Sequence, residues 1–83
     1  MLVKKTYTSF NRQEFIDYFG KTGVKKSEGV YEGQGWEVEI GDEKNKMIGS
    51  ICFKTIDLII NVEDTISKEF LDKLLLNFLR GGG

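Results

Sequence analysis

Hydrophobic and polar residues alternate along several stretches of the chain, and this period of two predicts β-strands. Residues 2–10 and 30–40 alternate in this way, while residues 47–54 are apolar on both sides. The clearest core face lies in residues 56–62, where every second residue is apolar: Ile56, Leu58, Ile60 and Val62. Glycines at positions 33 and 35 interrupt the second stretch and favour a β-bulge that lets Trp36 reach the core.

Two further stretches have helical spacing. Asn11 followed three residues later by Glu14 fits a capping box, and Phe15 and Phe19 stand four residues apart behind it. A second helix is predicted to begin at Asp64 or Thr65 and to end at Arg80. Its apolar stripe contains Phe70, Leu71, Leu74, Leu75, Leu76, Phe78 and Leu79.

Together these elements predict an α+β protein in the order β-α-β-β-β-α. The economical assembly is a four-stranded antiparallel sheet with both helices packed on one face. The first strand is expected at an edge or beside the fourth strand. Residues 1–80 would form a single domain, and residues 81–83 a flexible glycine tail.

Composition narrows the classes of function. The chain has 83 residues, of which 40% are apolar and 30% charged, with a net charge of −1. Such a balance is typical of a globular domain and gives no overall attraction to nucleic acid or anionic lipid. No apolar run approaches the ~18–20 residues that span a bilayer, and residues 1–5 lack the apolar stretch of a signal peptide. We therefore expect a cytoplasmic protein without contact to a membrane.

Catalytic and metal chemistry find little support. The sequence has no histidine, and Cys52 is its single cysteine. An internal disulfide, a cysteine-based zinc site and a histidine-activated nucleophile are therefore excluded. Cys52 lies between apolar neighbours and is expected to be a small buried hydrophobe. We predict no enzyme activity, no cofactor and no metal site, although Glu37, Glu39 and Asp57 offer carboxylates for a hard cation.

Charge is segregated along the chain. Residues 1–27 carry six basic and two acidic side chains, whereas residues 28–43 carry six acidic ones and no basic one. An acidic strip of this kind steers association with a basic partner, or is a solvated strand face that discourages aggregation.

Apolar residues predicted to face away from the helices suggest a contact surface. The main hypothesis is a small protein-binding module, an inhibitor or accessory subunit, that acts through an open sheet face with an acidic flank. Its candidate residues are Tyr31, Ile48 and Ile59 with Glu32, Glu37 and Glu39. The partner would be another protein or a second copy in a homodimer.

The last residues support an alternative. Leu79-Arg80-Gly81-Gly82-Gly83 resembles the Leu-Arg-Gly-Gly end of ubiquitin-like modifiers and the Gly-Gly end of sulfur carriers. The resemblance implies that the terminal carboxylate is adenylated inside an activating enzyme. The chain departs from the pattern by a third glycine, by a helix before the tail where that family has a strand, and by the absence of an opening hairpin. A helix C-cap explains the glycines as well.

Single-stranded nucleic-acid binding is a second alternative. Lys25 and Lys26 follow the first helix and could neutralise a backbone beside Tyr31 or Trp36. A solvated loop explains the same lysines, since the strand that follows is acidic. Nucleic acid is therefore not the favoured partner.

Overall fold

Within residues 1–78, six strands and two helices follow one another in the order β-α-β-β-β-β-β-α. The computed structural model describes residues 1–78. The strands are β1 (Leu2–Thr8), β2 (Val24–Ser27), β3 (Val30–Gly33), β4 (Trp36–Ile40), β5 (Lys44–Ile48) and β6 (Ile51–Val62). The helices are α1 (Arg12–Thr22) and α2 (Asp64–Asn77). The predicted α+β class is confirmed, with two strands more than expected.

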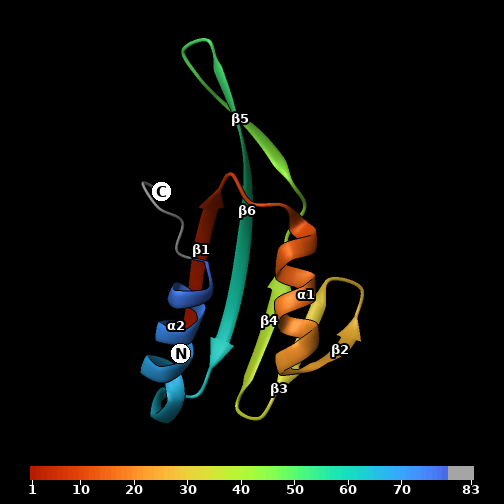
Figure 1. Cartoon of the computed structure of the whole chain (residues 1–83). Helices are drawn as coiled ribbons and strands as arrows, with labels where there is room; N and C mark the ends of the chain where they lie inside the picture. The colour runs from red at the N-terminus through yellow and green to blue at the C-terminus, as the bar shows by residue number, and fades with distance from the viewer. Residues whose placement is uncertain (79–83) are drawn as a thin grey trace.

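The sheet is antiparallel and is built around the long strand β6. Its order is β1-β6-β4-β3-β2, and β5 pairs with the beginning of β6 outside this path. The first strand therefore lies at an edge and beside the last strand, as predicted. Both helices cover the same face of the sheet, and the β5–β6 hairpin projects beyond the rest of the molecule (Figure 1).

The core lies between this face and the helices. Ile56, Leu58 and Ile60 are fully buried, which confirms the core face predicted from their alternation. From the helices, Phe15, Phe19 and Leu74 are also 0% exposed and join the same cluster. The stripe of α2 is narrower than the sequence suggests, because Leu75 and Leu76 are 57% and 73% exposed.

The two additional strands arise at glycine turns. Gly35 has a φ of 84° and lies in the turn between β3 and β4, so residues 30–40 form a hairpin instead of one bulged strand. Gly49, with a φ of 62°, divides residues 47–54 between β5 and β6 in the same way. Such positive φ values suit glycine, which has no Cβ to clash with the backbone. A further short strand, β2, forms in the predicted connector after α1 and pairs with β3.

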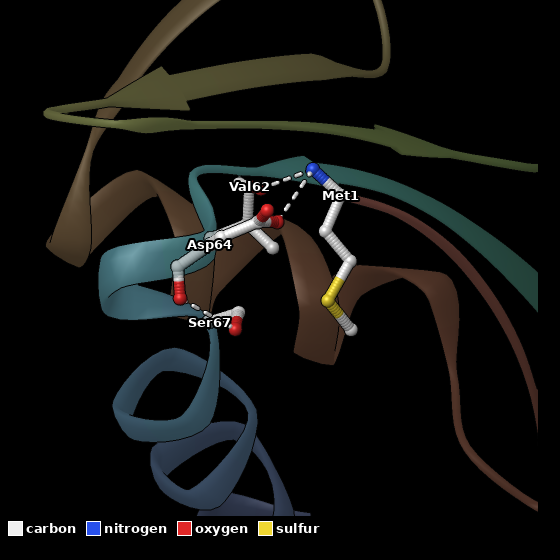
Figure 2. Close-up of polar contacts among 4 residues, drawn as sticks. All are labelled: Met1, Val62, Asp64 and Ser67. Atoms are coloured by element: carbon white, nitrogen blue, oxygen red, sulfur yellow. Dashed lines mark hydrogen bonds and ion pairs between the residues drawn. The ribbon is translucent and has the colours of Figure 1, made fainter.

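Hydrogen bonds and an ion pair stabilise the starts of the two helices. At α1 the Asn11 N–H donates to Glu14 Oε2 at 2.8 Å, as the capping pattern predicts. Helix α2 begins at Asp64, with Glu63 as its N-cap. The Met1 ammonium donates to the Val62 carbonyl at 2.7 Å and lies 3.4 Å from the Asp64 carboxylate (Figure 2). The start of β1 is thereby joined to the junction of β6 and α2.

Trp36 packs against the core and fills the space next to Gly23 and Gly33. A Cβ at Gly33 would overlap the indole ring, whereas a Cβ at Gly20 would meet nothing within 4 Å. We therefore expect Gly33→Ala to lower the free energy of unfolding by about 1–3 kcal/mol through overpacking. Gly20→Ala, inside α1, is the matched control and should raise it by about 0.5–1 kcal/mol. Urea unfolding of the two variants measures both, and equal midpoints would contradict this packing.

Residues 79–83 lie outside the described residues, and with them the glycine tail predicted at 81–83. The division into a domain over residues 1–80 and a tail therefore stays a prediction.

Within residues 1–78, neither helix is long and apolar enough to cross a membrane.

Candidate functional site

The sheet face opposite the helices is charged. Glu39 on β4 and Lys4 on β1 flank Ile59 of β6 in one row across the strands. Ile59 is 41% exposed. The neighbouring row pairs Glu32 with Glu37. Val30 pairs with Glu39 in the row of Ile59, so Ile59 and Val30 are separated by a carboxylate and do not form a continuous apolar centre.

Tyr31 and Ile48 do not lie on this face, which corrects the predicted contact surface. Tyr31 is 6% exposed and belongs to the core. The Gly35 turn places it opposite Val38, and directly paired residues share a face, so it points toward the helices. Ile48 is 58% exposed at the end of β5, where it pairs with Ile51 of the projecting hairpin. The six predicted residues are therefore spread over three places.

The acidic strip is partly neutralised by the lysines that follow α1. Lys26 Nζ lies 2.7 Å from Glu37 Oε2 and 3.9 Å from Glu32 Oε2. The hydrogen bond to Glu37, together with the two negative charges, raises the pKa of Lys26. Lys25 is in turn 3.1 Å from the Glu28 carboxylate. These lysines already have carboxylate partners, which weakens the case for a nucleic-acid backbone there.

The side chain of Trp36, which the alternative of nucleic-acid binding uses to stack with bases, packs against the core of the protein. Trp36 packs against Phe19 and Phe70, with ring centroids 5.6 and 5.3 Å away. These rings belong to the helix side of the sheet, whereas Glu37, the partner of Lys26, projects to the other side. The lysines and the aromatic ring therefore do not form a common surface.

Asp57 is the polar centre of the open face. Its Oδ1 accepts a hydrogen bond from Thr6 Oγ1 at 2.6 Å, and its Oδ2 is 3.8 Å from both Lys4 Nζ and Lys44 Nζ. The hydrogen bond from Thr6 and the two ammonium groups lower the pKa of Asp57. Within residues 1–78 no three acidic or cysteine side chains are grouped as metal ligands. Glu37, Glu39 and Asp57 thus do not converge on a cation.

Removing the Thr6 hydroxyl should return the pKa of Asp57 toward its ordinary value of 3.8. Because the folded-state pKa is lowered, the stabilisation is complete above the unfolded value and is lost as the pH falls through the folded value. Thr6→Val should therefore make the protein less sensitive to acid below about pH 4. Carboxyl NMR titration measures the shift, with the nearby Thr8→Val as control. An unchanged Asp57 pKa in Thr6→Val would contradict the assigned role of the hydroxyl.

The C-terminal end of α2 is fixed by a cluster of aromatic rings. Phe78, the residue after α2, stacks on Phe15 with ring centroids 4.4 Å apart. It also meets Tyr7, Phe10 and Tyr18 at 6.0, 5.4 and 5.4 Å. Burial among these rings raises the pKa values of Tyr7 and Tyr18. Phe78 is thus held to the body of the protein by rings of β1, α1 and the segment between them.

One family comparison bears on this position. The family model described as archaeal MoaD-like protein matches residues 3–83, which is nearly the whole chain and includes its last five residues. The chain belongs to this family. No curated protein gives a significant match. MoaD-like proteins are small, non-catalytic sulfur carriers related to ubiquitin-like proteins, and they act together with protein partners.

Membership in the MoaD-like family overturns the main functional hypothesis. The hypothesis of an inhibitor or accessory module that acts through an open sheet face is wrong. The comparison supports the alternative, a carrier protein that uses the sequence Leu79–Gly83. The family also supports the prediction that the chain is not an enzyme and that its partner is a protein. The sequence Leu79-Arg80-Gly81-Gly82-Gly83 already indicated a carrier. The predicted helix before it weakened this interpretation, because ubiquitin-like proteins have a strand at that place.

Sequence reasoning missed the role of the aromatic cluster. The helical spacing predicts Phe78 as one member of the stripe on the last helix, whereas the structure places it after α2, against residues of β1 and α1. Tyr7, Phe10 and Phe15 are close in sequence, and this density of rings was an available signal. The contact of β1 and α1 with the end of α2 could not be predicted from the sequence, because it depends on the order of the strands in the sheet.

Proposed function

We propose that this MoaD-like chain carries sulfur as a thiocarboxylate on the terminal carboxyl group of Gly83. The observation that supports it is the family match, which extends through residue 83 and covers the Leu79-Arg80-Gly81-Gly82-Gly83 sequence. The chain is then a substrate of an activating enzyme and a sulfur donor to a later acceptor.

The chemistry takes two balanced steps. A carboxylate oxygen of Gly83 attacks the α-phosphorus of ATP, and pyrophosphate leaves, which gives an acyl-adenylate. Hydrosulfide, or a sulfur donor of equal oxidation state, then attacks the carbonyl carbon, and AMP leaves with a proton released to solvent. No electron is gained or lost. The acyl-adenylate is needed because an ordinary carboxylate has no good leaving group.

Glycine suits the reacting end of such a chain. It has no Cβ, so its backbone can approach a nucleotide closely. The five residues after Phe78 can span at most about 18 Å when extended. This length lets the terminal carboxylate reach into an enzyme while the body of the carrier stays outside. The aromatic cluster around Phe78 supports the proposal by keeping the body folded up to the residue where this reach begins.

Intact-mass spectrometry after incubation with ATP, hydrosulfide and the activating enzyme of the source organism tests the proposal. We expect an ATP-dependent product in which one oxygen is replaced by sulfur, preceded by the acyl-adenylate when hydrosulfide is left out. An adenylate that goes on only to an amide with an amine would support a ubiquitin-like modifier instead. Absence of any adenylate would exclude both.

A further inference from the structure

The hairpin of β5 and the first residues of β6, residues 44–55, forms an arm that projects from the body (Figure 1). Within residues 1–78, β5 pairs with β6 and with no other strand. The molecule measures 42 × 26 × 21 Å, so this arm accounts for its elongation. An isolated two-stranded ribbon is only marginally stable in water, which suggests that a partner covers it.

The arm has an apolar tip and a basic base. Met47, Ile48 and Ile51, at the tip, are 63%, 58% and 58% exposed. Closer to the body, Lys44, Lys46 and Lys54 are all exposed. Lys44 and Lys54 lie 3.8 and 3.9 Å from the carboxylates of Asp57 and Glu43, which flank the arm in the sequence. No acidic residue occurs between positions 44 and 56. A surface complementary to the arm is therefore apolar in its depth, with acidic side chains at its rim that face Lys46 and share Lys44 and Lys54 with Asp57 and Glu43.

Charge disfavours a second copy of the chain as the occupant. Antiparallel pairing of β5 with its own copy would bring Lys44 and Lys46 of both chains onto adjoining edges. Lysines on an exposed edge strand protect a protein from such pairing. The occupant that the charges favour is a different protein with an acidic surface.

The base of the arm is fixed to the body. The Ser9 N–H donates to the Lys54 carbonyl at 2.9 Å, and Arg12 Nε donates to the Gly41 carbonyl at 3.1 Å. The Arg12 N–H also donates to Glu43 Oε1 at 2.9 Å. These contacts attach the arm to the body at Lys54 of β6 and at the residues that lead into β5.

Phe78, the last residue that the structure describes, lies near the base of the arm. Tyr7 and Phe10, which pack against Phe78, flank the residues of β1 that meet the base of the arm. Tyr7 pairs with Ile56, and Thr8 pairs with Thr55, the last residue of the arm. A protein that takes up the residues after Phe78 would therefore also lie beside the arm.

From this juxtaposition we propose that the arm docks the carrier on its activating enzyme. The apolar tip enters an apolar cleft, and the lysines meet acidic side chains at the rim of that cleft. The inference rests on the proposed function, because it names a contact surface for the enzyme that adenylates Gly83. It assigns the recognition of the carrier to two separate elements, the arm and the C-terminal residues.

Steady-state adenylation kinetics test the arm, with the purified enzyme that adenylates the wild-type chain as the probe. The variant Ile48→Thr/Ile51→Thr keeps β-branched residues while removing apolar surface. We expect the KM for the carrier to rise about tenfold while kcat stays unchanged, since the C-terminal residues are intact. Val24→Thr is the matched control, because Val24 is 69% exposed on the far edge strand β2. Urea midpoints equal to wild type establish that both variants are folded.

A second pair of variants tests the charges. Lys44→Glu/Lys46→Glu should lower kcat/KM about tenfold at low salt, and the loss should shrink as ionic strength rises. Lys21→Glu/Lys25→Glu, at the other end of the molecule, should have little effect. Unchanged KM values in both arm variants would overturn the docking role while leaving Gly83 adenylation intact. Failure of the wild-type chain to be adenylated would instead remove the proposed function, and the docking role with it.

Discussion

Phe15→Ala is expected to remove a large part of the stability of the folded protein. The side chain is fully buried, and its ring lies 4.4 Å from that of Phe78 and 5.0 Å from that of Tyr7. Truncating a buried phenylalanine costs about 3–5 kcal/mol, because apolar contacts are lost and a cavity remains. A domain of this size has a total stability of roughly 4–12 kcal/mol. The loss is therefore a large fraction of the total and should lower the urea midpoint well below that of wild type.

Chemical unfolding with urea, followed by circular dichroism, measures this effect. Leu76→Ala is the matched control, since Leu76 lies on α2 and is 73% exposed. Its free energy of unfolding should stay within about 0.5 kcal/mol of wild type. If the two variants unfold at the same urea concentration, the aromatic cluster is not the centre of the core.

A chain ended at Arg80 is expected to lose adenylation by at least about 100-fold. The deletion moves the terminal carboxylate about 10 Å closer to the body and places it on a residue with a large side chain. It removes no residue of α2 and none of the rings around Phe78. Stability should therefore be unchanged, so that the loss can be assigned to the missing glycines.

A chain that ends at Gly82 is the graded control for this deletion. It finishes in Leu-Arg-Gly-Gly, the pattern of ubiquitin-like modifiers, and is expected to keep measurable adenylation. ATP–pyrophosphate exchange with the activating enzyme follows both chains. Full activity of the chain ended at Arg80 would show that another carboxylate or another part of the protein reacts.

The core face of the central strand and the positions of the two helices could be predicted from the sequence. The alternation of Ile56, Leu58 and Ile60 is uninterrupted, so the face that packs under the helices could be assigned without any knowledge of neighbours. The capping residues of α1 are equally local. The class of fold and the single covered face of the sheet follow from these features.

The turns were the source of the errors on the sheet. Glycine inside an alternating stretch is compatible with a bulge, a bend or a tight turn, and the choice depends on pairing with distant strands. At Gly35 the turn reverses the chain and brings Tyr31 opposite Val38, into the core. At Gly49 the turn creates the arm and exposes Ile48 together with Cys52, which was expected to be buried.

The functional error had a different cause. Five residues at the end of a chain give little physical constraint, and the helix before them differs from the strand that precedes the tail in the ubiquitin-like pattern. The predicted apolar surface is not formed, because Tyr31, one of its three apolar residues, is buried in the core. The match over residues 3–83 supplied what five residues could not, because it weighs the whole chain at once.

The most direct test of sulfur carriage is to locate the sulfur atom by fragmentation mass spectrometry. The chain should carry Cys52→Ser, because Cys52 is an exposed free thiol that could itself bind sulfur. After reaction with ATP, hydrosulfide and the activating enzyme, we predict that oxygen is replaced by sulfur in the fragment that ends at Gly83, and only when ATP is present. Sulfur found elsewhere in the chain, or at Gly83 without ATP, would contradict the proposed carrier function.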